Sequence, residues 1–205
     1  MRFRIGALAL LAVLTSTLAC GVADPGSTDT SAAWVITPPV EFNQSVASAP
    51  LLASSPIADF SERTVALNIQ SLAADTPLPA VSDQLRAAGF LGGRERTFQG
   101  WSKDLTLVRS RALVFADAQG AQRYLDFLTA NPEGMFGTST TVAPIHSQNH
   151  SGSVFQPPPC ACHRANPVVT GVVRDGSTLV WLSINGPLAT TARLTSLLRA
   201  PTTTR

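Results

Sequence analysis

All three histidines of the chain lie near two of its three cysteines. Thiolate and imidazole groups are ligands that Cu(I) and Zn²⁺ favour, and a Cys-x-Cys spacing lets two sulfurs reach one ion. This segment is therefore a candidate metal site, with copper or zinc as the ion. Its residues are His146, His150, Cys160, Cys162 and His163.

A disulfide between Cys160 and Cys162 is the alternative for the same segment. Cysteine pairs outside the cytoplasm usually oxidise, although a bridge across one residue closes a small, strained ring that is more easily reduced. The histidines would then be incidental residues of a polar loop. Free thiols and pairing between molecules stay open, whereas the spacing argues against a thioredoxin-like role. Apart from the metal alternative, no cofactor is expected.

A second candidate site depends on a hairpin predicted over residues 92–115. If its turn closes symmetrically at two central residues, four arginines stack as two cross-strand pairs, where like charges about 5 Å apart destabilise the sheet. Planar guanidinium groups suit carboxylate or phosphate, and the next pair is apolar, so the face would fit an amphiphile with an acidic head. Alternatively, these arginines extend into solvent or pair with acids from a helix. The pairs are Arg94 with Arg111 and Arg96 with Arg109.

No arrangement typical of a catalytic centre is evident in the sequence. There is no Gly-x-Ser-x-Gly, P-loop or dinucleotide-binding motif, and no pair of carboxylates stands out. We therefore expect no enzymatic activity and name no catalytic residue.

The first twenty residues have the pattern of an export signal. Arg2 and Arg4 precede an uncharged, mostly apolar run over residues 5–14, and a small residue precedes Cys20. The run is shorter than the roughly 20 apolar residues of a spanning helix. Thr17-Leu18-Ala19-Cys20 resembles the lipobox of bacterial lipoproteins, with threonine where leucine is usual. The resemblance implies that residues 1–19 are removed and that Cys20 is lipidated; an ordinary cleaved signal is the alternative.

The charge balance argues against a nucleic-acid partner. The chain carries 15 Lys+Arg against 13 Asp+Glu. Because Arg2 and Arg4 lie in the signal and no acidic residue does, the remaining chain is formally neutral, without a polybasic tail. Two or three acyl chains hold a protein on a bilayer almost irreversibly. The expected partner of Cys20 is thus the lipid bilayer, on the extracytoplasmic face of the cell membrane.

Beyond the signal, composition and periodicity divide the chain into three parts. Residues 20–62 are rich in Pro, Ser, Ala and Thr and are predicted to be a flexible tether, with apolar exceptions such as Pro50-Leu51-Leu52 that dock on the domain or the membrane. Residues 63–200 form a single domain. Residues 201–205 are a polar tail.

Strand and helix patterns alternate within the domain. The predicted strands cover residues 63–72, 92–100, 104–115, 168–174 and 177–185, with a weakly strand-like stretch at 134–144. The predicted helices begin at Pro77, after Asp117 and at Pro187, and residues 145–166 read as a long irregular segment. This order predicts an α+β fold: an antiparallel sheet with two to three helices packed on one side.

Short motifs in the domain resemble a group of actinobacterial cell-envelope lipoproteins. They are Ala88-Gly89-Phe90-Leu91-Gly92-Gly93-Arg94-Glu95-Arg96-Thr97-Phe98, then Phe115-Ala116-Asp117-Ala118-Gln119-Gly120-Ala121, then Arg174-Asp175-Gly176 through Gly186-Pro187. The resemblance implies a fold and a location, and no activity. We therefore expect a membrane-anchored, extracytoplasmic, non-catalytic binding or interaction module, whose partner is an envelope protein or an amphiphilic ligand. The alternatives are a copper- or zinc-binding protein using residues 146–163 and a structural envelope protein without a small ligand.

Overall fold

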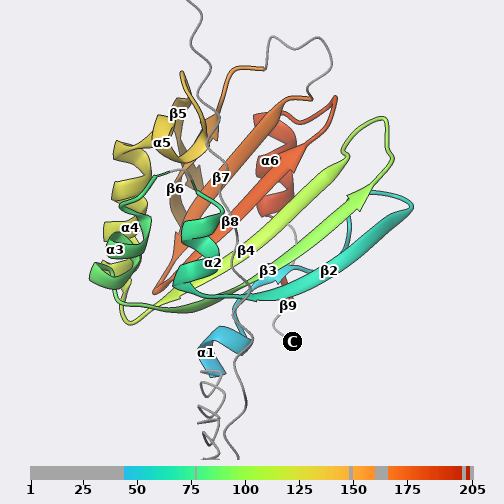
Figure 1. Cartoon of the computed structure of the whole chain (residues 1–205). Helices are drawn as coiled ribbons and strands as arrows, with labels where there is room; N and C mark the ends of the chain where they lie inside the picture. The colour runs from blue at the N-terminus through green and yellow to red at the C-terminus, as the bar shows by residue number, and fades with distance from the viewer. Residues whose placement is uncertain (1–43, 77, 148–149, 160–165, 200–201, 204–205) are drawn as a thin grey trace, which may run out of the picture. The chain divides into compact units, whose positions relative to one another are not determined.

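A seven-stranded antiparallel sheet, in the order β2-β3-β4-β8-β7-β6-β5, forms the centre of the fold (Figure 1). This computed structural model describes residues 44–76, 78–147, 150–159, 166–199 and 202–203. A smaller sheet pairs β1 with β9. The strands are β1 Leu51–Leu52, β2 Phe60–Leu67, β3 Phe90–Gly100, β4 Leu107–Phe115, β5 Thr141–Ser147, β6 His150–Gln156, β7 Val168–Asp175, β8 Thr178–Asn185 and β9 Thr202–Thr203. The predicted α+β class with an antiparallel sheet is confirmed.

Four helices pack on one face of this sheet, which we call the α4 face. They are α2 Ile69–Ala74, α3 Val81–Ala87, α4 Ala118–Ala130 and α5 Pro132–Phe136. The core between them and the sheet contains Leu85 from α3, Leu128 from α4 and Phe155 from β6, all fully buried. Among the described residues, these helices gather over the β3–β4 end that is remote from the turn at residues 101–106, and they leave the other end of the α4 face uncovered (Figure 1).

Helix α4 follows the prediction closely. The Asp117 side chain accepts a hydrogen bond from the Gly120 amide at 2.6 Å, which caps the first turn. Its buried residues recur at helical spacing, as expected for one face against a core. They are Ala121, Tyr124, Leu125 and Leu128.

Tyr124, the only tyrosine of the chain, gives the fold a pH dependence. Burial raises the pKa of its phenol well above the ordinary value, and the nearby Arg111 charge only partly offsets this. Because the folded-state pKa exceeds the unfolded one, the phenol's contribution is complete below about pH 10 and is lost as the pH rises beyond it. We expect the free energy of unfolding to fall by up to about 1.4 kcal/mol per pH unit there.

Urea unfolding of the wild type and of Tyr124→Phe, at about pH 9 and about pH 11, measures this effect. The wild type should lose more stability than the variant between the two conditions. Phenolate absorbance of this single tyrosine supplies a direct check, since it should appear with unfolding. Equal losses in both proteins would contradict the expectation.

The opposite face of the sheet is also covered, and we call it the α6 face. Helix α6, Thr191–Leu198, packs there, and Leu194 of α6 lies against Gly171 of β7. The expectation that helices lie on one side is therefore wrong. Strand β7 and the second half of β4 are buried in unbroken runs, so both of their faces need a covering layer.

The domain begins well before residue 63, which corrects the predicted tether over residues 20–62. Helix α1, Gln44–Ala47, and strand β1 cover part of the α6 face, and Val46, Leu51 and Ile57 are buried there. The docking foreseen for Leu51 and Leu52 therefore occurs on the domain. The pairing of Leu51 with Thr203 likewise makes part of the predicted polar tail a strand.

Three other element boundaries differ from expectation because of local capping. The strand predicted over residues 63–72 ends at Leu67, where Asn68 and Ser71 form a capping box that starts α2. The helix expected from Pro77 begins at Val81, since the Thr76 hydroxyl donates to the Leu72 carbonyl instead of capping forward. The last helix begins after its cap at Thr190, later than Pro187.

One of the two remaining hairpins was predicted from the sequence, and the other was not. The β7–β8 hairpin turns at Gly176 with φ +57, as the Asp175-Gly176 pair predicts. Residues 145–147 and 150–156, part of the segment expected to be irregular, instead belong to the paired strands β5 and β6. No helix in the described part of the chain is both long and apolar enough to span a bilayer.

Candidate functional site

The β3–β4 register decides where the four predicted site arginines lie. The Gly100 amide donates to the Thr106 carbonyl, so the connection between the strands holds five residues. The turn is therefore centred on one residue instead of between two. Glu95 therefore pairs with Arg111, and Thr97 pairs with Arg109. The predicted pairs are wrong by one residue, which places Arg94 and Arg96 on one face of the sheet and Arg109 and Arg111 on the other.

On the α6 face, Arg94 and Arg96 hold the N-terminal segment against the sheet. The Arg94 guanidinium donates to the carbonyl of Ala47, and that of Arg96 donates to the carbonyl of Leu52 at 3.0 Å. The Arg96 Nε also faces a Glu62 carboxylate oxygen at 3.2 Å, an ion pair without hydrogen-bond alignment. Both arginines therefore have a structural role, and they do not form an anion site with Arg109 and Arg111.

On the α4 face, the buried Arg111 is the centre of an ionic cluster with the largely buried Glu95 and the half-exposed Asp75. Its Nε donates to Glu95 and its Nη2 donates to Asp75, while the Thr97 hydroxyl donates to Glu95 Oε1 at 3.0 Å. Arg111 is 7% exposed. The two nearest carboxylates on this face are thus both engaged by one guanidinium.

Aromatic and hydroxyl groups extend this cluster across β8 and β7. The Arg111 guanidinium lies 5.7 Å from the Trp181 ring centroid, a cation–π arrangement. Trp181 Nε1 donates to Ser183 Oγ at 3.2 Å, and Ser183 lies 2.7 Å from the Thr170 hydroxyl. A small cavity of about 150 Å³ opens beside them. It is lined by Asp75, Thr76, Arg109, Arg111, Met135, Trp181 and Ser183.

A larger hollow of about 690 Å³ lies on the α4 face where the helices leave the sheet open. Its lining comes mainly from β2, β3 and β4. It includes the polar residues Ser61, Arg63, Thr97, Gln99 and Arg109 and the acidic residues Asp75 and Glu95. A second hollow of about 660 Å³ shares Ser61, Gln99 and Leu107 with it and continues to Trp101 and Asn185. We call the two together the sheet groove.

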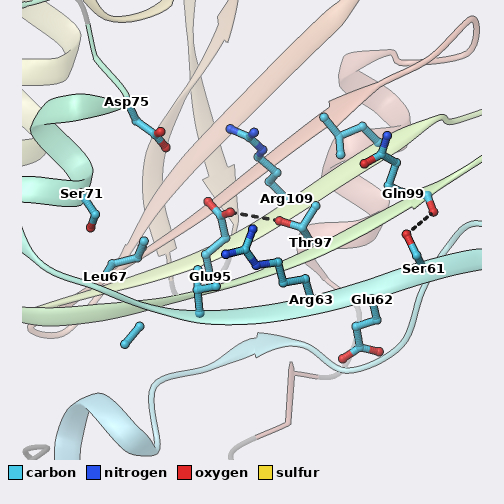
Figure 2. A pocket seen from close by; sticks show the side chains of 13 residues that line it. Ser61, Glu62, Arg63, Leu67, Ser71, Asp75, Glu95, Thr97, Gln99 and Arg109 are labelled. Atoms are coloured by element: carbon cyan, nitrogen blue, oxygen red, sulfur yellow. Dashed lines mark hydrogen bonds between the residues drawn. The ribbon is translucent and has the colours of Figure 1, made fainter.

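The floor of the sheet groove is a cross-strand row in which Arg63 pairs with Thr97 and Thr97 pairs with Arg109. Figure 2 shows these three side chains on the same side of the sheet, whereas Glu62 points to the other side. Arg63 and Arg109 are exposed, and neither has an ion pair or hydrogen bond with another described residue. The groove therefore presents two guanidinium groups without a direct ionic partner on either side of one hydroxyl, and its two nearby carboxylates, Asp75 and Glu95, are engaged by Arg111.

Arg63, Ser61, Thr97 and Gln99 were not among the residues predicted for a site. A signal was present in β2, where Ser61 and Arg63 precede Val65 at alternate positions of one face. Polar residues at the start of such a face, followed by apolar ones, indicate a strand that leaves its helical cover. The partner residues Thr97 and Gln99 depend on the hairpin register, which sequence alone does not fix.

The predicted histidine and cysteine site lies largely outside the described residues. Cys160, Cys162 and His163 are outside them, as is the lipidation candidate Cys20. His146 and His150 belong to β5 and β6, where the backbone of His146 pairs with Ser151 and that of His150 with Ser147. Within the described ranges, no group of three or more His, Cys, Asp or Glu is placed to hold a metal ion.

Comparison with known proteins finds a distant likeness to solved structures and no family. No protein-family model matches the chain, and no curated protein matches it. Among solved structures, the extracellular domain of PknH from Mycobacterium tuberculosis matches with a TM-score of 0.45 and 7% sequence identity. That match covers 68% of this chain and 81% of the other.

Proposed function

We propose that the protein is a lipid-anchored, extracytoplasmic, non-catalytic binding module that holds its ligand in the sheet groove. The observation that carries the binding role is the groove itself: about 690 Å³ of open space whose floor carries unpaired Arg63 and Arg109. Binding sites are typically concave and of several hundred cubic ångström, with a few convergent polar groups. The groove has this size and this kind of lining.

The chemistry of the groove favours binding over catalysis. Glu95 and Asp75, two acidic residues that line the hollow, are both held by Arg111. A general acid or base has to exchange a proton with the substrate, and an ion-paired carboxylate is poorly placed to do so. The free groups, Arg63 and Arg109, are donors that hold an anion without transferring a proton.

The location rests on the sequence of the signal. Arg2, Arg4 and the apolar run before Cys20 match an export signal, and the four residues ending at Cys20 resemble a lipobox. The Pro- and Ser-rich stretch after Cys20 suits a tether between the bilayer and the domain. Since the domain begins by residue 44, this tether is shorter than the predicted 20–62 segment.

Replacing Cys20 should abolish acylation. We expect the wild type to incorporate a clickable palmitate analogue and to partition into the detergent phase of Triton X-114, and we expect Cys20→Ala to incorporate none. Cys160→Ala is the matched control and should label like the wild type. Undiminished labelling of Cys20→Ala would contradict the anchor.

Ligand binding in the groove can be tested without knowing the ligand. A polar fragment library is screened by amide chemical-shift mapping on protein purified from the full chain, as its host processes it. We expect hits that move the amides of Ser61, Thr97 and Gln99. Ser61→Trp should obstruct these hits, whereas Thr64→Trp, an equally exposed residue of β2 on the α6 face, should not. Hits that avoid the groove, or that survive Ser61→Trp, would overturn the assignment.

A further inference from the structure

We infer that the ligand of the sheet groove is an oligosaccharide with an acidic group at one end. This inference rests on the proposed function and names the class of molecule that the groove takes. Three features of the described residues carry it: an anion position, a floor that lacks free hydroxyl protons, and an elongated hollow that ends at an exposed tryptophan.

The anion position lies between Arg63 and Arg109. The two arginines flank Thr97 in one cross-strand row, each about 5 Å away along the sheet. Their charges are not neutralised by Glu95, because Arg111 engages that carboxylate from inside the fold. Like charges so placed favour a bound anion, and a planar guanidinium can bind a carboxylate, phosphate or sulfate through two donors.

The hydroxyl groups on the groove floor already donate their protons within the protein. The Thr97 hydroxyl donates to Glu95 Oε1, and that of Ser61 donates to the Gln99 carbonyl at 3.2 Å. The Thr106 hydroxyl, in the second hollow, donates to Asn185. Each hydroxyl therefore offers a ligand only its lone pairs. A ligand that hydrogen-bonds to these hydroxyls must bring its own donors, which sugar hydroxyls supply and an acyl chain does not.

The groove is longer than a single sugar needs. From Thr97 to Trp101 the chain advances four residues, which is about 13 Å along an extended strand. Trp101 is 97% exposed and lines the far hollow, so a large ring is open to a ligand there. An indole offers both an apolar face and an N–H, which suits the C–H face and hydroxyls of a sugar ring.

Acidic residues at the far end limit the ligand's charge. Asp59 lines the second hollow, and Asp104 lies in the turn beside Trp101. Negative groups on that end of a ligand would meet these carboxylates. The arrangement therefore fits a chain with its acid at the arginine end and neutral sugars toward Trp101, and it disfavours a uniform polyanion.

The test uses 3′-sialyllactose, a trisaccharide with one terminal carboxylate, in isothermal titration calorimetry with protein purified from the full chain as its host processes it. Lactose, sodium sulfate and dodecyl phosphate are titrated alongside. We expect 3′-sialyllactose to bind. Lactose and sulfate should bind at least about tenfold more weakly, because lactose lacks the acidic group and sulfate lacks the sugars.

Single substitutions test which side chains contact 3′-sialyllactose. Arg63→Gln and Arg109→Gln should each weaken 3′-sialyllactose binding about tenfold, as expected for loss of a charged hydrogen-bonding partner. Trp101→Ala should weaken it about threefold or more. Arg123→Gln, an exposed arginine of α4 away from the groove, is the matched control and should leave the affinity unchanged. All four positions are exposed, so thermal melts should stay close to the wild type.

The outcomes separate this inference from the function on which it rests. If lactose binds as well as 3′-sialyllactose, or both arginine variants retain wild-type affinity, the acidic-sugar assignment is overturned. If only dodecyl phosphate binds, the ligand is an acidic amphiphile and the glycan assignment fails while the groove remains a binding site. If no titrant binds although fragments map to the groove, the glycan assignment likewise fails. An absence of any groove binding overturns both.

Discussion

Replacing Arg111 by alanine is expected to lower the free energy of unfolding by about 3–5 kcal/mol. The guanidinium is 7% exposed and engages both Glu95 and Asp75. Its removal leaves Glu95, whose side chain is 12% exposed, as a buried charge without its partner. Breaking a buried ion pair from one side destabilises a protein far more than replacing the whole pair does. Loss of the contact with the Trp181 ring adds a smaller amount.

Urea unfolding of Arg111→Ala measures this effect, and Arg109→Ala is its matched control. Arg109 lies two residues away on the same strand and the same face, but it is exposed and has no ionic partner among the described residues. Its replacement should change the free energy of unfolding by no more than about 0.5 kcal/mol. The double variant Arg111→Met with Glu95→Leu should recover much of the loss. A loss below about 1 kcal/mol in Arg111→Ala would show that the cluster is not buried as described.

The same substitution links stability to the binding site. In the native fold, Arg111 engages the Glu95 and Asp75 carboxylates, which line the same hollow as Arg63 and Arg109. Without Arg111, these carboxylates would lose their ionic partner and their negative charges would offset the two open guanidiniums across the hollow. Arg111 is therefore a positioning residue, which keeps the groove attractive to anions without itself lining the larger hollow.

The sequence predicted elements whose signals are local and missed the relations between them. Helix α4 and the β7–β8 hairpin were predictable because their caps and turn lie within a few residues: Asp117 for the helix, and Asp175-Gly176 for the hairpin. The β3–β4 register was not, since one residue more in the connection moves every side chain to the other face. The hydrogen bond between Gly100 and Thr106 fixes that register, and no residue type in the turn predicts this bond.

The sequence does indicate that the α6 face of the sheet is covered, but a search for alternating apolar residues does not detect this signal. Leu113, Val114 and Phe115 are consecutive and all buried, which marks a strand covered on both faces rather than an alternating one. Such runs require a layer on each side of the sheet. The segment that supplies part of it, residues 44–57, is rich in Ser, Ala and Pro and so resembles a linker in composition. Its burial depends on Arg94 and Arg96 reaching its carbonyls, which only the folded register reveals.

Gly120→Ala is expected to destabilise the protein by about 3 kcal/mol, although alanine is the better helix former by about 1 kcal/mol. Gly120 lies in the first turn of α4, against the end of α3. A Cβ added there would lie 2.1 Å from the Ala88 carbonyl oxygen, which is backbone and has no rotamer to change. The chain at that point is already fixed, because Gly89 has φ +72 and its carbonyl accepts from the Ala116 amide.

Gly134→Ala separates this packing effect from helix propensity. Gly134 is also helical, in α5, but its added Cβ would approach only a methyl of Leu78 at 3.2 Å, and that side chain can move. Its expected change is within about 1 kcal/mol in either direction. Urea unfolding of both variants gives the comparison. Stabilisation by Gly120→Ala would show that α3 and α4 do not approach this closely, and the α4 face would then have to be covered differently at the end of the sheet where Arg111 and Glu95 are buried.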